Sequence, residues 1–351
     1  MMKIVCVIAF VIVCGCTASK KTGSSDNSIT IRQNDANKRI DVFINEKLFT
    51  AFQWPDSAFK PVLYPIINSA GTEITRGYPL NPRAGERVDH PHHIGMWFNY
   101  GNVNGIDFWG NSYDIPAEQR QKTGGIIKFL RAENITQGDP KGSLTVYNSW
   151  QDPGGNELLY EKTTFDFISG DSIRIIDRVT ALTATSGAVN MPDTKEGMFA
   201  IRVARQLELP STEAVVLTDA NNHPTTVPQM SNDGVTGNYR SSEGIVGDSV
   251  WGTSARWMNL SGVIGNDSVS VIICDHPKNP GHPTHWHARG YGLFSVNPLG
   301  VKDFTQGKHQ MNFSIPANQT AIFRYRVIIT SGRHLTGSEI DALTDDFGKK
   351  Y

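Results

Sequence analysis

Hydrophobic and polar residues alternate along most of the chain from about residue 28 onward. A period of two residues is typical of β-strands that bury one face. Segments 28–54 and 142–182 show it, as do four shorter segments at 267–275, 290–296, 309–315 and 319–330. Turn residues at Asp152–Gly155 and Ser169–Asp171 divide the second long segment, which predicts at least three consecutive strands there.

Helical periodicity is scarce by comparison. The helix expected from the pattern begins with Ser338 as its N-cap and continues through EIDALTDDF. The 33 glycines and 18 prolines fit short strands joined by many turns. The sequence therefore predicts an all-β protein, a large two-sheet β-sandwich of supersandwich-like layout with one short C-terminal helix. We expect segment 210–245 to be a long loop in preference to a domain boundary, so that residues 28–351 form a single domain.

The first 27 residues depart from this pattern. Residues 1–15 carry one lysine followed by an apolar run too short to span a bilayer, which is typical of a secretory signal peptide. Val13-Cys14-Gly15-Cys16 resembles a bacterial lipobox, so Cys16 is the expected lipidation site, and residues 16–27 form a flexible tether. We expect export and lipid anchoring at the outer membrane, with either face of that membrane compatible. Cys274 would then be the single cysteine of the folded part, and we expect it to be a buried apolar residue.

Charge and composition exclude one class of partner. The formal net charge is −1, and no basic block or RNA-stacking motif occurs in the sequence. We therefore expect no nucleic-acid binding, and contact with the membrane through the N-terminal lipid only.

Seven of the ten histidines lie in two short segments, 89–98 (DHPHHIGMWF) and 275–290. In the first, Pro91 is expected to hold His90 extended, so that His90 and His92 point one way and His93 the other, on an edge or loop. In the second, alternate positions of a strand from 285 to 297 share one face. This face carries His285, His287, Arg289, Tyr291, Leu293, Ser295 and Asn297. Histidine, arginine and asparagine together favour a strand that lines a site, and an ordinary exposed face is the alternative.

Three kinds of chemistry fit these histidines: a divalent metal bound by His90, His92 and His287, proton transfer without a metal, or polar packing. No HExxH or CxxC spacing decides between them. Charged groups near glycines, Arg76, Lys195 and Glu196, could act as acids, bases or clamps, or could form turn ion pairs. Tryptophans could offer flat faces to a sugar ring or pack in the core; these are Trp97, Trp109, Trp251 and Trp257.

Four ordered segments carry a resemblance to a known family: DHPHHIGMWFNYGNVNGIDFW, TKEGMFAIRVA, SEGIVGDSVWGTSARW and HPTHWHARGYGLFSVNPLG. Together they resemble the PmoA-like family of bacterial secreted proteins, often called methane oxygenase PmoA, from about residue 55 to 335. A subunit of the membrane-bound methane monooxygenase would need a long apolar segment, which this chain lacks after its signal. The family's association with carbohydrate-degradation genes implies a glycan context, and its β-rich layout is similar in style to the sugar mutarotases.

The resemblance also implies site residues. The motifs fall on Asp89, His90, His92 and His93, on Lys195 and Glu196, on Glu243, Trp251 and Arg256, and on His285, His287, Arg289 and Asn297. Thr284 precedes His285 and Trp286, where relatives more often place tyrosine before the tryptophan, so His287 is preferred over His285.

These observations lead to one functional hypothesis with two alternatives. We expect a secreted lipoprotein that acts on a carbohydrate as a lyase, epimerase or hydrolase. The expected catalytic residues are His90, His92, His287, Glu196, Arg289 and Arg76. The expected substrate-binding residues are Asp89, His93, Trp97, Asn297, Lys195, Glu243, Trp251 and Arg256. The alternatives are a non-catalytic glycan-binding lipoprotein and a metal-dependent oxidase.

Overall fold

The computed structural model of the protein describes residues 27–351. The predicted signal peptide, Cys16 and nearly all of the predicted tether lie outside the described residues. Within residues 27–351, no helix has both the length and the apolar character needed to cross a bilayer.

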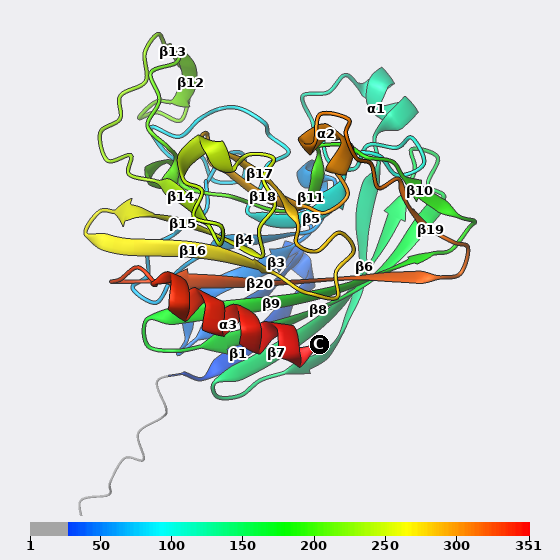
Figure 1. Ribbon diagram of the computed structural model, residues 1–351, viewed down its shortest axis with the longest axis horizontal. Coiled ribbons are helices and arrows are strands. Elements are labelled where there is room, and N and C mark those ends of the chain that lie inside the picture. The colour runs from blue at the N-terminus through cyan, green and yellow to red at the C-terminus, as the bar shows by residue number, and fades with distance from the viewer. Residues whose placement is uncertain (1–26) are drawn as a thin grey trace, which may run out of the picture.

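Two eight-stranded antiparallel sheets dominate the structure (Figure 1). In spatial order, the first contains β1 (Ile29–Asn34), β2 (Arg39–Ile44), β3 (Lys47–Gln53), β4 (Val62–Ile66), β5 (Met96–Tyr100), β11 (Gly197–Arg202), β18 (Leu293–Asn297) and β17 (His285–Arg289). The second contains β14 (Asn238–Ser241), β15 (Trp257–Ile264), β16 (Asp267–Asp275), β20 (Thr320–Thr330), β9 (Ile173–Ala184), β8 (Glu157–Ser169), β7 (Lys141–Gln151) and β6 (Ile126–Thr136). The predicted all-β sandwich is confirmed.

Smaller elements complete the described part of the chain. Two-stranded sheets form from β10 (Val189–Met191) with β19 (Phe313–Ile315) and from β12 (Val215–Thr218) with β13 (Pro224–Val227). The α-helices are α1 (Ala117–Thr123), α2 (Val301–Phe304) and α3 (Gly337–Lys350). Short 3-10 turns occupy Asp35–Asn37, Asp56–Ala58, Arg205–Leu207 and Gly247–Val250.

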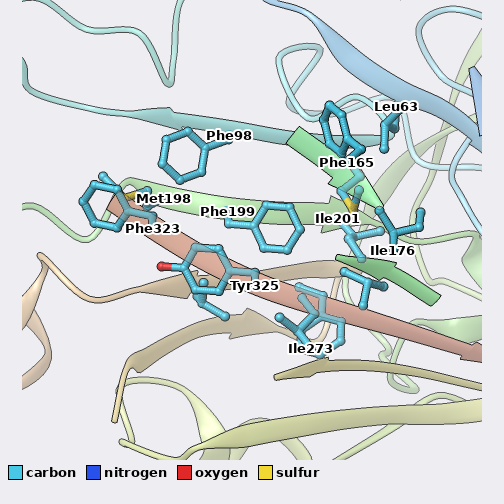
Figure 2. Close-up of a cluster of buried hydrophobic side chains, with 14 of the residues drawn as sticks. Leu63, Phe98, Phe165, Ile176, Met198, Phe199, Ile201, Ile273, Phe323 and Tyr325 are labelled. Atoms are coloured by element: carbon cyan, nitrogen blue, oxygen red, sulfur yellow. The ribbon is translucent and has the colours of Figure 1, made fainter. Parts of the chain in front are cut away.

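The main core lies between the two sheets, as the alternation of the strands requires. Figure 2 shows Phe98 and Phe199 of the first sheet close to Phe323 and Tyr325 of the second. The rings of Phe199 and Tyr325 stack with centroids 5.0 Å apart, and those of Phe98 and Phe323 are 5.7 Å apart. Complete burial of an apolar side chain of this kind contributes roughly 1.5–3 kcal/mol. The large apolar area between the sheets therefore supplies the stability of the sandwich.

Helix α3 covers the outer face of the second sheet (Figure 1). Its Ile340 and Phe347 pack on Ile272 and Ile328, whose strand neighbours face the main core instead. The predicted start of this helix was wrong: the N-cap is Thr336, not Ser338. Thr336 Oγ1 accepts from the Glu339 amide at 3.3 Å, and the Glu339 carboxylate accepts from the Thr336 amide at 2.8 Å. This reciprocal capping box satisfies two orphan helix donors, which Ser338 cannot do from inside the first turn.

Segment 210–245 was predicted as a loop and is more ordered than that. It contains the β12–β13 hairpin, which projects beyond the two large sheets in Figure 1, and strand β14. Asp219 Oδ1 accepts from the amides of Asn221 and His223, and Asn222 has a φ of 65°. These Asp and Asn residues thus make a hairpin turn, a role that their turn propensity allows. Helices α1 and α2 were likewise not predicted.

Candidate functional site

The candidate site lies on the face of the first sheet that is turned away from the second sheet. Phe98, Phe199 and Val296 of β5, β11 and β18 face the main core. Their strand neighbours point to the opposite face, where Trp97, Ala200 and Leu293 belong to a separate apolar cluster. Side chains that line the site on this opposite face therefore lie above a cluster of packed apolar side chains.

The predicted strand from 285 to 297 is a hairpin. Strands β17 and β18 are joined at Gly290–Gly292, and His285 pairs with Asn297, His287 with Ser295 and Arg289 with Leu293. Gly292 takes a φ of 89°, which a glycine adopts without strain. Because residues directly opposite in an antiparallel pair share a face, the odd-numbered positions still lie together. The predicted face is therefore preserved although the chain reverses.

A hollow of about 440 Å³ opens on this face. Its lining brings together seven residues expected from the sequence: His90, His92, His93, Lys195, Glu196, His287 and Arg289. Asp107, Trp109, Gly110 and Tyr291 complete the lining. The two histidine segments thus meet, as the sequence hypothesis required.

The first histidine segment is a tight turn and not the extended run that was predicted. The His93 amide donates to the His90 carbonyl at 2.9 Å, and His90 has a φ of 41°. The rings of His90 and His93 consequently stack in parallel at 4.8 Å, and His90 stacks on Tyr291 at 5.1 Å. Pro91 suits the second position of such a turn because its own φ is fixed, so it bends the segment here.

Arg76 holds this turn from below and does not line the hollow. Its guanidinium is buried and donates to the carbonyls of Asp89, His90 and His93 at 2.9, 3.0 and 3.0 Å. The Asp89 carboxylate accepts from Arg76 at 2.5 Å and from Arg202 at 2.7 Å. Burial alone would raise the pKa of Asp89, but Arg202, His90 and Arg76 together hold it well below its usual range. Arg76 and Asp89 therefore position the histidine turn.

His287 is held in one tautomer. Its Nδ1 lies 2.7 Å from the Lys195 carbonyl, which can only accept, so Nδ1 carries the proton and Nε2 carries the lone pair. Burial lowers the pKa of His287 to about 4. The imidazole is therefore neutral at pH 7, with Nε2 as its basic atom.

Two side chains of β18 hold the segment from Thr194 to Gly197, whose Lys195 carbonyl contacts His287. Ser295 Oγ donates to the Gly197 carbonyl at 2.6 Å, and Asn297 Nδ2 donates to the Thr194 carbonyl at 2.7 Å. Both side chains are buried. Asn297, expected to bind substrate, instead tethers the segment that carries Glu196 into the hollow.

Two carboxyl groups line the same hollow as this imidazole. Burial raises the pKa of Glu196, Lys195 at 3.4 Å opposes the rise, and nearby Asp107 adds to it. Burial also raises the pKa of Asp107, whose Oδ1 accepts from the amides of Trp109 and Gly110, both at 2.8 Å. Asp107 was not among the expected site residues, although it lies in the segment DHPHHIGMWFNYGNVNGIDFW that carries the family resemblance.

Two buried donors beside the hollow are unpaired within residues 27–351. His93 Nδ1 lies 3.2 Å from Arg202, which can only donate, so Nδ1 accepts and Nε2 carries the proton. Burial lowers the pKa of His93 well below its usual value, so this ring is neutral. Its Nε2 and the Trp109 Nε1 are buried and have no hydrogen-bond partner within residues 27–351. Such groups cost free energy until an acceptor atom meets them.

Lys60, also missed from the sequence, lies directly behind the histidine turn. Its buried Nζ donates to the His92 carbonyl at 2.7 Å and lies 5.6 Å from the centroid of the Trp97 ring. Burial lowers the pKa of Lys60 to about 7, and Asp107 opposes the fall. Burial, followed by the charge of Lys60, holds the pKa of His92 far below its ordinary value. A single lysine between Phe59 and Pro61 gave no sequence signal of this environment.

The remaining expected residues lie elsewhere. Trp97 is buried under the hollow, stacked on His93 at 5.2 Å. Trp251 lines a neighbouring hollow, and Glu243 is exposed beside Ser242. Arg256 is paired with Asp341 and Asp345 of α3, at 2.6 and 2.7 Å. The third motif therefore does not contribute to the histidine-lined hollow.

The geometry does not fit the expected metal site. Within residues 27–351, no group of three or more His, Cys, Asp or Glu side chains is arranged to hold a metal ion. His90 is stacked between His93 and Tyr291, and Nδ1 of His287 is used by a carbonyl. The proposed ligands His90, His92 and His287 therefore line one hollow without forming a coordination set.

Comparison with protein families gives one match. A model described as a family of unknown function, DUF6807, covers residues 39–345. The chain belongs to this family. The match includes every residue that lines the hollow. The finer PmoA-like resemblance is not named by it and stays a prediction, and no curated protein matches the chain.

Comparison with solved structures gives matches of low sequence identity and low TM-score. The galactosidase domain of an α-galactosidase–sucrose kinase is 9% identical, with a TM-score of 0.37 over 86% of this chain and 41% of that chain. A glycoside hydrolase family 97 enzyme variant from a Pseudoalteromonas species is 10% identical, with a TM-score of 0.31 over 87% and 34%. A family 36 α-galactosidase variant from Geobacillus stearothermophilus is 10% identical, with a TM-score of 0.36 over 86% and 40%. This chain spans less than half of each of these proteins, and similarity at this level does not establish a shared activity.

Proposed function

We propose that the protein is a carbohydrate-active enzyme that works by proton transfer, as a lyase, epimerase or hydrolase. The observation that carries the proposal is the locked neutral tautomer of His287, in a hollow that also holds the carboxyl groups of Glu196 and Asp107. A neutral imidazole with a fixed lone pair can take a proton, and a carboxyl group with a raised pKa can give one. Groups with perturbed pKa values gathered in one hollow are typical of catalytic sites.

Carbohydrate is the ligand class that the lining suits best. Lys195 and Arg289 line the hollow as hydrogen-bond donors, and Glu196 and Asp107 as acceptors, a combination that suits the hydroxyl groups of a sugar. Tyr291 and Trp109 add aromatic surface beside these donors. The glycan context implied by the PmoA-like resemblance agrees with this choice.

In the proposed mechanism, His287 Nε2 accepts a proton from the substrate or from an attacking water. Glu196, in its protonated form, donates to the departing or neighbouring oxygen, and Asp107 favours that form by its charge. His90 and His92 also line the hollow and contact the substrate there. Arg76 acts through the turn that it holds, as a positioning residue.

Turnover of a panel of poly- and oligosaccharides tests this proposal. His287→Gln is expected to lower kcat by about 10²–10⁴-fold, the usual contribution of a positioned acid or base. For the wild type, kcat/KM is expected to fall as the pH drops through about 4, where His287 becomes protonated. His223→Gln is the control, because His223 is exposed on the β12–β13 hairpin. Full turnover by His287→Gln would refute the assignment, and sugar binding without turnover by the wild type would favour a glycan-binding protein.

We also propose export and lipid anchoring through Cys16, supported by the charged-then-apolar segment and the lipobox-like residues before it. Metabolic labelling with an alkyne-bearing fatty acid should mark the wild type and not Cys16→Ser. Equal labelling of both would contradict Cys16 as the acylated residue. Absence of both proteins from the membrane fraction would contradict anchoring.

A further inference from the structure

Arg289 stands out among the cations of the site because it has no anionic partner. It ends strand β17, and its guanidinium carbon lies 5.5 Å from the centroid of the Trp251 ring and 5.9 Å from that of Tyr291. Within residues 27–351, no carboxylate lies within ion-pair distance of it. By contrast, Lys195 pairs with Glu196 at 3.4 Å, and Arg87 pairs with Glu208 at 2.8 Å.

Arg289 also marks the junction of two hollows. A second hollow of about 440 Å³ adjoins the first and is lined by Arg87, Ser211, Asp248 and Trp251, among others. Arg289 and Tyr291 line both hollows. A ligand that fills both must therefore pass the free guanidinium, with the Trp251 ring beside it.

Most carboxylates in the two hollows are engaged by groups other than Arg289. In the first hollow, Glu196 is paired with Lys195, and Asp107 Oδ1 accepts hydrogen bonds from two backbone amides. In the second, Glu213 is paired with Arg87 at 3.1 Å. Asp248 lies beside the turn, since a Cβ at Gly290 would be 2.9 Å from its Oδ1. Asp248 makes no ion pair with Arg289 within residues 27–351, and its charge would oppose an anion there.

We infer that the substrate is an acidic oligosaccharide of at least two units, with a uronate carboxylate bound by Arg289 at the junction of the two hollows. The planar guanidinium fork matches a carboxylate with two parallel hydrogen bonds, and the Arg289 side chain is exposed. The sugar rings of the oligosaccharide would occupy the two hollows, against Tyr291 and Trp251. The inference rests on the proposed carbohydrate substrate and narrows its class.

Calorimetry on residues 27–351 tests the inference. The probes are glucuronate, galacturonate and their dimers and trimers, each compared with the neutral sugar in which the carboxylate is reduced to a hydroxymethyl group. At least one uronate dimer is expected to bind about ten-fold or more tightly than its neutral counterpart, as a charge-assisted pair requires. It should also bind more tightly than the monomer. Arg289→Met should abolish the preference for the uronate, and Arg289→Lys should keep part of it.

Arg240→Met provides a matched control. The Arg240 guanidinium also lies 5.5 Å from a tryptophan ring, that of Trp257, and has no ion pair within residues 27–351. It lines neither hollow, so the uronate preference should survive its loss. Equal affinity for acidic and neutral probes, no binding by either, or an unchanged preference in Arg289→Met would each overturn the inference.

The outcomes also separate this inference from the proposed enzyme function. Turnover of neutral sugars alone would leave the enzyme proposal standing and remove the uronate. Arg289-dependent uronate binding without turnover would leave the uronate inference standing and remove the enzyme proposal.

Discussion

The buried ammonium of Lys60 should make the stability of the protein depend on pH in a way that one substitution removes. The pKa of Lys60 falls from 10.5 in the unfolded chain to about 7 in the folded protein because of its burial. The folded state therefore disfavours the protonated form of Lys60. Stability from the neutral form is fully present above about pH 10.5 and is lost as the pH falls towards 7.

The size of the effect follows from the same two values. A fall from 10.5 to about 7 corresponds to about 5 kcal/mol in total, at about 1.4 kcal/mol for each pH unit. Between pH 7 and pH 9 the unfolded chain keeps its proton while the folded protein releases it. Lys60 should thus add about 2 kcal/mol to the free energy of unfolding over this interval.

Urea unfolding of residues 27–351 at pH 7 and pH 9 measures this quantity. Lys60→Met keeps the length of the side chain and removes the titrating group, so its change between the two pH values should be about 2 kcal/mol less favourable than that of the wild type. Lys128→Met is the matched control, because Lys60 and Lys128 both line a separate hollow of about 420 Å³, where Lys128 is exposed to water. The reasoning fails if wild type and Lys60→Met change equally, or if Lys128→Met reproduces the effect.

Three further predictions concern the turn, the helix and the hollow. Asp89→Asn leaves two buried arginines without their carboxylate and should lower the free energy of unfolding by about 3–5 kcal/mol. The control Asp56→Asn changes an exposed ion pair and should cost less than about 1 kcal/mol. Equal urea midpoints for the two variants would contradict this prediction. Thr336→Ala should cost about 1 kcal/mol in the same assay, because it removes one half of the α3 capping box, and no change would show that the cap contributes nothing. If Glu196 acts as the acid, kcat should fall as the pH rises through its raised pKa, and this alkaline limb should vanish in Glu196→Gln. Lys195→Met should move the limb to higher pH, because Lys195 opposes the rise; an unmoved limb would assign the acid to another group.

Much of the fold could be read from the sequence because the signals are local. Strand β16 spans Asp267–Asp275, the segment expected from its alternation, and the turns after Gln151 and Ser169 occur where Asp, Pro and Gly predicted them. The helix start was missed by two residues because Ser and Thr are both good caps. Only the partner three residues later, Glu339, distinguishes Thr336.

The site was predictable in part. The shared face of His287 and Arg289 follows from strand geometry and survived the unexpected hairpin. The conformation of His90 does not follow from its neighbours, since it depends on hydrogen bonds from Arg76 to the turn. Asp107 and Lys60 gave no local signal either, because their shifted pKa values arise from burial by segments distant in the chain.

The order of strands β5, β11 and β18 in the first sheet has a practical consequence. The walls of the hollow come from three widely separated stretches of chain, and they meet only when all three strands are paired. A ligand of this hollow therefore binds only the assembled sheet and must raise the melting temperature of the whole fold. At a hundred times its Kd, a ligand adds about 2.7 kcal/mol, or several degrees. The shift in melting temperature can thus rank candidate ligands of this protein before any reaction is known.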